Sequence, residues 1–389
     1  MTERIALVVP RCAQDAVGGA EALALSVARE LRGGYEVEIL TTCANDYWSW
    51  ENFYPEGRAE IEGVFIERFV VDRPRDLAEF NRLSRRVRYR MGSTSTEEQE
   101  TWMRAQGPYA PGLLNALATR EHDLVLFFTY LYATTYFGLP LVADRSILVP
   151  LAHDEWPFYF PMWDAFFARV QALIFASPEE RELVQRRFRD LPIAGPVIHP
   201  AMQPPLVGEK PSVANLPEHY LLYVGRIDGA KGVAELCELF GDYLRRNPAT
   251  PLHLLFAGPG VPIGVANDRI RFLGVVDDVT KATLLRGADA FVMPSYHESL
   301  CIALLEAWAC GTAALVNGWN PVLVGQCRRS NGGVWYHDQA SFDAALDVLD
   351  APTRAMLGRQ GAAFVARTYT GDARSAVTAA RRSLAKARP

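Results

Sequence analysis

The segment ADAFVMPSYHESLCIALLEA, residues 288–307, decides the fold of the second half of this chain. Its first part, residues 288–294, is an apolar run that ends at a proline and predicts a buried strand. A short apolar helix pattern follows, so Glu298 falls in the loop between strand and helix and Glu306 falls inside the helix. Ligands of open α/β sheets bind in such loops, because N–H groups at the helix start face an anion. The segment therefore predicts a ligand with phosphate and hydroxyl groups; the alternative is a capping carboxylate and a surface residue.

A second segment, YLLYVGRIDGAKG at residues 220–232, carries cations in the same type of loop. An apolar strand ends at Gly225 and Arg226, and Lys231 opens the next helix. The two cations fit a diphosphate, since a guanidinium forks onto two oxygens and an ammonium acts as a compact point charge. A solvated pair of loop cations is the alternative, which would be favoured if no helix flanked by glutamates followed.

Together these motifs resemble the nucleotide-sugar-binding domain of retaining glycosyltransferases of family 4, which have the GT-B fold. The resemblance implies that Arg226 and Lys231 hold the donor diphosphate and that Glu298 contacts the donor sugar. It also implies that Glu306 binds the ribose hydroxyls and that the backbone near Val275 and Val276 meets the base. The matching positions are Gly225, Arg226, Lys231, Gly232, Gly258, Pro259, Gly260, Phe272, Leu273, Gly274, Glu298 and Glu306.

One stretch departs from the family pattern. Relatives often carry small, glycine-rich residues after the first glutamate, whereas this chain has Ser299, Leu300 and Cys301. We expect these three residues to line the donor site together with Gly225 and Gly258. The departure leaves the donor sugar undecided, and the donor nucleotide is expected to be UDP- or GDP-linked.

The N-terminal half predicts a second β-α-β unit, with apolar strands at residues 4–10 and 35–40 around a helix that opens at Gly18 and Gly19. A dinucleotide site needs a Gly-x-Gly-x-x-Gly turn and an acidic residue after the second strand. This chain has a lone glycine pair and two threonines instead, so NAD binding is not expected. The resemblance implies that Gly18 and Gly19 lie over the donor phosphates, where missing side chains permit close backbone approach.

His153 ends a predicted strand at residues 148–152. The resemblance implies that it reaches the transferred sugar and completes a catalytic set with Arg226, Lys231 and Glu298; the alternative is a structural histidine. No protein nucleophile is predicted, because the family's retaining chemistry is usually described with a donor phosphate oxygen taking the acceptor proton. No metal or other cofactor is expected, since the two cations offset the charge of the leaving diphosphate.

The resemblance implies an α/β protein of the GT-B class, with two Rossmann-like domains that face each other across a cleft. The acceptor-side domain is expected over residues 1–200 and the nucleotide-sugar-binding domain over 201–368. Residues 369–389 are expected to form a helix that returns to the first domain. Prolines cluster at 196–211, where we place the junction.

Composition restricts the function further. The chain has 389 residues, 40 basic and 45 acidic, and this mildly negative balance argues against a nucleic-acid partner. Six cysteines without Cys-x-x-Cys spacing predict reduced, buried thiols. The N-terminus shows no signal peptide pattern and no apolar run reaches about 18 residues, so a cytoplasmic location is expected.

A dense basic cluster occupies Arg82–Arg90 on a predicted helix. It suits peripheral contact with anionic lipid headgroups or a lipid-linked diphosphate acceptor. The alternative is a solvated helix face that pairs with Glu97, Glu98 and Glu100.

The sequence as a whole predicts a metal-independent hexosyltransferase acting on a glycan, lipid-linked or small-molecule acceptor in polysaccharide or glycoconjugate biosynthesis. Two alternatives stay open: a GT-B-fold epimerase or phosphorylase, and a non-catalytic subunit that binds sugar nucleotides and regulates an assembly complex. The epimerase or phosphorylase needs a catalytic carboxylate or cofactor lysine that the sequence does not identify.

Overall fold

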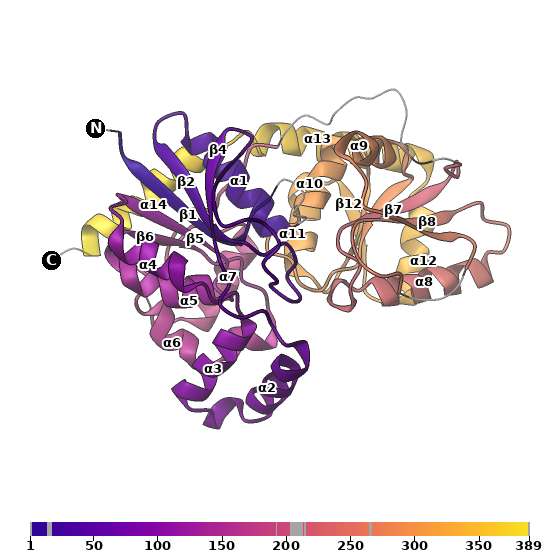
Figure 1. Ribbon diagram of the computed structural model, residues 1–389. Coiled ribbons are helices and arrows are strands. Elements are labelled where there is room, and N and C mark those ends of the chain that lie inside the picture. Colours follow the sequence, from indigo (N-terminus) through magenta and orange to yellow (C-terminus); the bar gives the residue numbers. More distant parts are fainter. Residues whose placement is uncertain are drawn as a thin grey trace. The chain divides into compact units, whose positions relative to one another are not determined.

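The computed structural model describes residues 2–13, 18–191, 193–202, 213, 215–263 and 267–387 (Figure 1). The chain divides into two compact units, residues 1–200 with 371–389, and residues 201–370. Residues 203–211 of the expected junction fall outside the described ranges. Each unit is described by itself below.

The N-terminal unit contains a six-stranded sheet in the order β3-β4-β2-β1-β5-β6. All neighbours are parallel except β3 and β4. Strand order reverses between β1 and β5, as in Rossmann-like sheets. The strands are β1 Arg4–Arg11, β2 Glu36–Thr42, β3 Gly57–Ile61, β4 Val64–Phe69, β5 Leu124–Phe128 and β6 Ser146–Val149.

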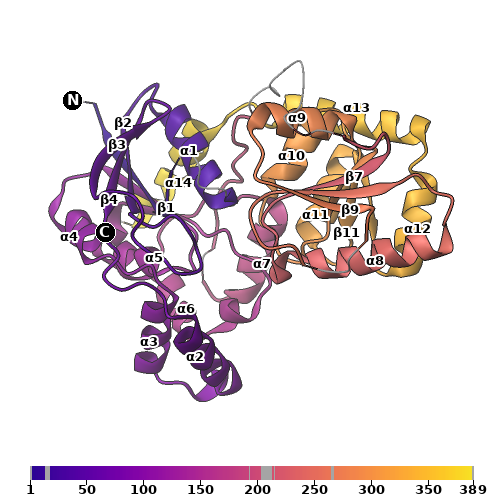
Figure 2. The same ribbon diagram turned by 45° about the vertical axis from the view of Figure 1, so that its right-hand side comes forward.

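Helices cover this sheet, and α2 and α3 form a hairpin that stands off it in both views (Figures 1 and 2). A capping box between Ser95 and Glu98 begins α3. The helices are α1 Gly19–Leu31, α2 Leu77–Tyr89, α3 Thr96–Gln106, α4 Pro111–Thr119, α5 Ala133–Gly138, α6 Met162–Phe167, α7 Pro178–Arg187 and α14 Ala373–Ala387.

The last helix, α14, belongs to the N-terminal unit, where it packs against α1. Its apolar positions, such as Val377, are buried, and Arg381 forms two hydrogen bonds with the Glu3 carboxylate at 2.7 and 3.0 Å. The chain crosses between units twice. Beside these crossings, His199 N–H donates to Asp372 in the first unit at 2.8 Å, and Met202 N–H donates to Tyr369 C=O in the second at 3.0 Å.

The C-terminal unit contains a six-stranded parallel sheet in the order β12-β11-β10-β7-β8-β9. In both views α9, α10 and α13 lie on one side of the sheet and α8 and α12 on the other (Figures 1 and 2). The strands are β7 Tyr220–Val224, β8 His253–Ala257, β9 Ile270–Gly274, β10 Ala290–Met293, β11 Ala314–Asn317 and β12 Gly333–Tyr336. The helices are α8 Val233–Arg246, α9 Asp278–Gly287, α10 Ile302–Ala309, α11 Pro321–Ser330, α12 Gln339–Val348 and α13 Ala351–Thr368.

Buried apolar strands explain both sheets. In β5 every residue is buried, and in β10 likewise, because helices cover both faces of a parallel sheet. All six cysteines are free and five of them are buried, which agrees with the predicted reduced thiols. Across the described ranges, no helix has both the length and the apolar character that spanning a membrane requires.

Candidate functional site

The C-terminal sheet has its topological switch point between β7 and β10. From β7 the chain builds β8 and β9 on one side, and then places β10, β11 and β12 on the other. Because the strands are parallel, the loops that follow β7 and β10 leave the same edge of the sheet. A crevice opens at such a point, and it is where ligands of these sheets bind.

The loop after β7 is fitted closely to its neighbours. Gly258, at the end of β8, has φ +147°, and a Cβ atom there would lie 2.0 Å from the carbonyl oxygen of Gly225. Gly232 has φ +70°, and its Cβ would lie 2.6 Å from the carbonyl oxygen of Pro294, which follows β10. Side chains at both positions would collide with backbone, so glycine is required for these loops to pack.

Lys231 and Glu298 meet across the switch point. Lys231 ends a short 3-10 turn, η4 (Gly229–Lys231), after β7, and Glu298 lies in the loop after β10. The Lys231 ammonium donates to Glu298 Oε1 at 2.6 Å, and both side chains are largely buried. The structure thus brings together the residue predicted to hold phosphate and the residue predicted to contact the donor sugar.

Arg226 lies on the same loop, directly after β7. Its guanidinium is 3.7 Å from the carboxylate of Asp228, a buried residue, and its carbonyl oxygen accepts a hydrogen bond from the Tyr223 hydroxyl at 2.6 Å. Asp228 also caps η4 by accepting from Lys231 N–H at 3.1 Å. The turn that presents the lysine and the arginine is therefore held by one carboxylate.

Ser299, Leu300 and Cys301 are buried between Glu298 and the start of α10. Cys301 precedes the helix in the left-handed conformation, with φ +59°, a region that glycine adopts at no steric cost. Burial raises the pKa of the Cys301 thiol well above its ordinary value, so the thiol stays protonated. These three residues can offer a ligand little more than backbone N–H groups and the serine hydroxyl.

Glu306, on α10, has a partner that the sequence analysis missed. The Lys281 ammonium, on α9, donates to Glu306 Oε1 at 2.8 Å and lies 3.0 Å from Asp278. Burial alone lowers the pKa of Lys281, but the Glu306 and Asp278 carboxylates outweigh it and raise that pKa. No sequence signal links the two residues, because they lie 25 positions apart on separate helices.

Val275 follows β9 at the same edge of the sheet. Gly258 N–H donates to the Gly274 carbonyl at 2.8 Å, which joins the ends of β8 and β9. Val275 is 66% exposed, and its predicted contact with the base stays a prediction.

In the N-terminal unit, Gly18 and Gly19 begin α1 after β1. A Cβ at Gly18 would lie 2.0 Å from the Glu21 carboxylate and 2.9 Å from the Arg11 guanidinium, whereas one at Gly19 would meet nothing within 4 Å. Arg11 and Glu21 form an ion pair in which both side chains are largely buried. Gly18 is therefore closely packed, whereas the position of a side chain at Gly19 is open.

His153 lies in the loop after β6, with Nδ1 3.6 Å from Glu155. The loop is held by Glu180, whose fully buried carboxylate accepts from the N–H groups of Ala152 at 2.8 Å and Ala176 at 2.6 Å. Burial raises the pKa of Glu180 to about 7, although these hydrogen bonds act in the opposite direction. The sequence analysis missed Glu180, which resembles an ordinary first-turn glutamate.

The basic cluster at Arg82–Arg90 lies on α2 and its C-cap. Glu98 forms ion pairs with Arg86 at 2.8 Å and with Arg90 at 3.1 Å, and Arg88 lies over the Trp156 ring. The pairing expected as the alternative to lipid contact is thus present for two of the arginines.

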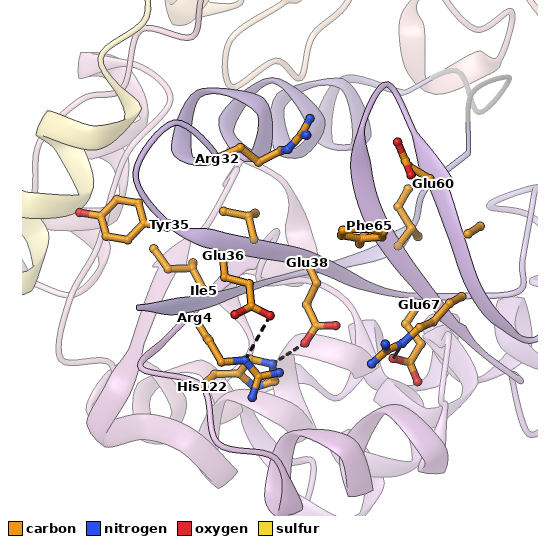
Figure 3. Close-up of a pocket in the computed structure, with 14 residues that line it drawn as sticks. Arg4, Ile5, Arg32, Tyr35, Glu36, Glu38, Glu60, Phe65, Glu67 and His122 are labelled. Atoms are coloured by element: carbon orange, nitrogen blue, oxygen red, sulfur yellow. Dashed lines mark hydrogen bonds and ion pairs between the residues drawn. The ribbon is translucent and has the colours of Figure 1, made fainter. Parts of the chain in front are cut away.

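An open pocket of about 490 Å³ lies at the opposite edge of the N-terminal sheet, where β1 and β2 begin (Figure 3). Its charges pair with one another: His122 bonds Glu38 at 2.7 Å, and Arg4 is 3.7 Å from Glu36. Ligand sites of parallel sheets lie at the carboxyl edge, and none of the predicted site residues lines this pocket. We therefore do not assign the donor site to it.

A family model matches part of the C-terminal unit. Residues 218–347 match a family model described as glycosyl transferases group 1, and this range holds both lysine–glutamate pairs. The matched range lies within the C-terminal unit. The family resemblance stated from the motifs is thereby confirmed.

Similar curated proteins include a D-inositol 3-phosphate glycosyltransferase from Catenulispora acidiphila, 32% identical over 41% of this chain and 42% of that protein. A phosphatidyl-myo-inositol mannosyltransferase from Mycobacterium tuberculosis is 35% identical over 25% of this chain and 27% of its own length. This chain therefore spans less than half of the length of these relatives.

Solved structures resemble the fold of the whole chain. Sucrose-phosphate synthase from Thermosynechococcus elongatus has a TM-score of 0.67 at 19% identity, covering 99% of this chain and 100% of that one. Anabaena HepE in complex with UDP and glucose has a TM-score of 0.62 at 14% identity, covering 99% and 100%. The predicted GT-B fold, with two Rossmann-like domains, is confirmed.

Proposed function

We propose that the chain is a retaining glycosyltransferase that moves a sugar from a nucleotide diphosphate sugar to a hydroxyl group of an acceptor. The observation that carries the proposal is the Lys231–Glu298 pair at the switch point of the C-terminal sheet. An ammonium that can bind phosphate lies there beside a carboxylate that can accept hydrogen bonds from hydroxyl groups. A ligand with a diphosphate joined directly to a sugar needs both groups within a few ångströms.

In the proposed reaction, the bond between the anomeric carbon and the diphosphate oxygen breaks, and the acceptor oxygen bonds to the same face of that carbon. Negative charge grows on the leaving diphosphate, so Arg226 and Lys231 stabilise the transition state more than the ground state. Glu298 orients the sugar by accepting its hydroxyl hydrogens. The acceptor proton passes to a phosphate oxygen of the departing nucleotide, which balances the charge without a protein base or a metal ion.

The relatives support a sugar transferase that acts on a polyol or lipid-linked acceptor, since their names include inositol phosphate and phosphatidyl-myo-inositol. The HepE complex with UDP and glucose supports a nucleotide-linked donor. We therefore place this chain in polysaccharide or glycoconjugate biosynthesis, with UDP- or GDP-linked hexoses as donors.

The test begins with calorimetric titration of the purified protein with UDP- and GDP-linked glucose, mannose and N-acetylglucosamine. The donor that binds is then incubated with inositol phosphate, sugar phosphates and lipid-linked sugars. Mass spectrometry detects products, and NMR reports the anomeric configuration. A product with retained configuration is expected. Binding without turnover on any acceptor would support a regulatory subunit instead, and no binding of any donor would overturn the proposal.

Peripheral lipid contact through Arg82–Arg90 belongs to the same proposal. Glu98 pairs with Arg86 and Arg90, so we expect Arg82 and Arg85 to contribute most. Sedimentation with phosphatidylglycerol vesicles should fall in an Arg82→Glu, Arg85→Glu variant, with phosphatidylcholine vesicles as the control. Equal binding by wild type and variant would remove lipid contact from the proposal.

A further inference from the structure

Trp319 is the most exposed of the eight tryptophans of this chain, at 62%. It lies in the loop after β11, at the carboxyl edge of the C-terminal sheet. Tyr296, in the loop after β10, is 39% exposed, and His337, which follows β12, is exposed as well. We call these three residues the aromatic surface. Single exposed apolar residues are common on protein surfaces, so the meaning of this group depends on how it is built.

The indole ring of Trp319 is held in place although it is exposed. Its Nε1–H donates to the His337 carbonyl at 3.0 Å, and the indole and imidazole rings pack at nearly a right angle, with 5.0 Å between their centroids. The Trp319 backbone N–H donates to Asn317 Oδ1 at 2.9 Å. A ring that is already fixed loses little conformational freedom when a ligand covers it. The exposed indole is therefore preorganised for stacking.

Two buried amides join the aromatic surface to the loop that carries Glu298. Asn317 donates to the Pro294 carbonyl at 2.8 Å, and Asn320 donates to the Ser295 carbonyl at 3.3 Å. Because β10 and β11 are adjacent parallel strands, about 4.8 Å apart, the loops that follow them leave the sheet side by side. The aromatic surface is therefore fixed relative to the loop where the donor sugar is proposed to bind.

Polar groups border the aromatic surface. The Tyr296 hydroxyl donates to Glu235 Oε1 at 3.1 Å and also interacts with the Asn317 amide. The exposed imidazole of His337 lies beside the Trp319 ring. A pyranose presents C–H groups on its faces and hydroxyl groups around its edge, so it is complementary to an aromatic ring with polar neighbours.

We propose that the aromatic surface binds a pyranose ring of the acceptor, which stacks on Trp319 and hydrogen-bonds at its edge with Tyr296 and Glu235. This inference rests on the proposed function and deepens it, because it names the chemical class of the acceptor. A nucleotide sugar carries one hexose, which the proposed function assigns to Glu298, and its base is predicted near Val275, after β9 on the other side of β7. A second pyranose beside the donor sugar therefore comes from the acceptor. Acceptors that carry a sugar ring should be preferred over those that lack one.

The first test measures sugar binding without turnover. Two-dimensional NMR of protein with isotope-labelled tryptophan reports the indole N–H of Trp319, which is identified as the signal that the Trp319→Phe variant lacks. Maltose, cellobiose and mannobiose are the probes, and glycerol, a polyol without a ring, is the control. At least one disaccharide should shift the Trp319 signal and leave the signal of the buried Trp308 unchanged. No shift with any of the three sugars would overturn the inference.

The second test compares Trp319→Ala with Phe65→Ala in steady-state kinetics. Phe65, on β4 of the N-terminal unit, is 61% exposed, so its variant is a matched control for the loss of an exposed ring. Trp319→Ala should raise the acceptor KM about tenfold or more, as truncation of a tryptophan contact often does. The donor KM and kcat should stay within about twofold, because stacking is the same in the ground and transition states. Trp319→Phe should keep most of the acceptor affinity, and Phe65→Ala should keep all of it.

Thermal unfolding checks that each variant folds. If Trp319→Ala fails to fold, Trp319→Leu removes the aromatic ring, keeps apolar bulk and should raise the acceptor KM in the same way. An unchanged acceptor KM in a folded variant without the ring, or a donor KM that rises with it, overturns the inference alone. Failure of wild type to bind any nucleotide sugar would overturn the proposed function, and the NMR titration would still decide whether the aromatic surface binds a sugar.

Discussion

The carboxyl edges of the two sheets differ in the groups that pair with their carboxylates and in the residues that adopt positive φ angles. At the C-terminal edge, carboxylates pair with lysine side chains, and glycines such as Gly232 and Gly258 adopt most of the positive φ angles of the loops, with Cys301 left-handed as well. At the N-terminal edge, the buried carboxylate of Glu180 is held by backbone N–H groups, and the positive φ angles belong to Thr129 at +67° and Leu151 at +48°.

The difference concerns what each edge can do for a ligand. Lysine–glutamate pairs at the C-terminal edge can reorganise around a phosphate or a hydroxyl group without exposing an unpaired charge. At the N-terminal edge, a left-handed threonine or leucine costs on the order of 1 kcal/mol or more, so surrounding packing must hold these loops in shape. We therefore expect the first edge to carry the chemistry and the second to supply a rigid surface for the rest of the acceptor.

Lys231→Ala should break the C-terminal edge most severely. The variant loses the cation that stabilises the leaving diphosphate and leaves Glu298 without its ammonium partner. By comparison with loss of a preorganised donor to an oxyanion, kcat should fall about a hundredfold, on the order of 3 kcal/mol. Steady-state kinetics on the folded protein measure this, and Arg226→Lys should also be impaired because an ammonium cannot make a two-pronged contact. Turnover near the wild-type rate would place the phosphate elsewhere.

Glu180→Gln tests how the N-terminal edge is held. The folded-state pKa of Glu180, about 7, lies above the ordinary 4.5, so the folded state binds the proton more tightly than the unfolded state. The stabilisation from this group is full below pH 4.5 and is lost as pH rises through 7. The free energy of unfolding of wild type relative to the variant should therefore fall by roughly 2–3 kcal/mol between pH 4.5 and 7.

Urea unfolding curves at several pH values measure this difference, and Glu179→Gln on the same turn is the matched control. Parallel pH profiles for wild type and Glu180→Gln would mean that this carboxylate does not titrate in that window.

Glu306→Ala tests whether the two glutamates of the C-terminal edge have different roles, one in donor binding and one in turnover. Loss of charge-assisted hydrogen bonds to a ribose should weaken donor binding by about 1.5–3 kcal/mol, and the donor KM should rise roughly ten- to a hundredfold while kcat changes little. Glu298→Gln should instead lower kcat, because that carboxylate lies at the reacting sugar. A Glu306 variant with an unchanged donor KM would remove this residue from the ribose site.

Chelation should have the smallest effect. The proposed mechanism offsets the diphosphate charge with Arg226 and Lys231, so activity should persist in excess EDTA. The measurement is initial rate with EDTA and after adding back Mg²⁺ or Mn²⁺. Loss of activity that either ion restores would show that protein cations are insufficient.

The sequence predicted the C-terminal edge better than the N-terminal edge for a physical reason. Glycines mark where loops need positive φ, so the loops that carry Gly225, Arg226, Lys231 and Glu298 could be located from local patterns; their roles stay predictions. Strands such as β1 and β7 were likewise predicted from apolar runs. Within each sheet, strand order could be anticipated only through the family resemblance.

The remaining features depend on packing between distant segments. Lys281 meets Glu306 because α9 and α10 are in contact, and Glu180 reaches Ala152 across 28 positions. Thr129 and Leu151 adopt left-handed conformations that their residue types disfavour. No local pattern marks such positions, since tertiary contacts alone impose them.

The return of α14 to the first unit has a consequence for folding during synthesis. The entire C-terminal unit is encoded between α7 and α14, and its ends meet where Met202 N–H donates to the Tyr369 carbonyl. That unit can close its own core as soon as its last helix leaves the ribosome, since domains generally fold as units. Until α14 is made, however, the surface of α1 that it covers stays open to water. The N-terminal unit is therefore synthesised first but completes its fold last.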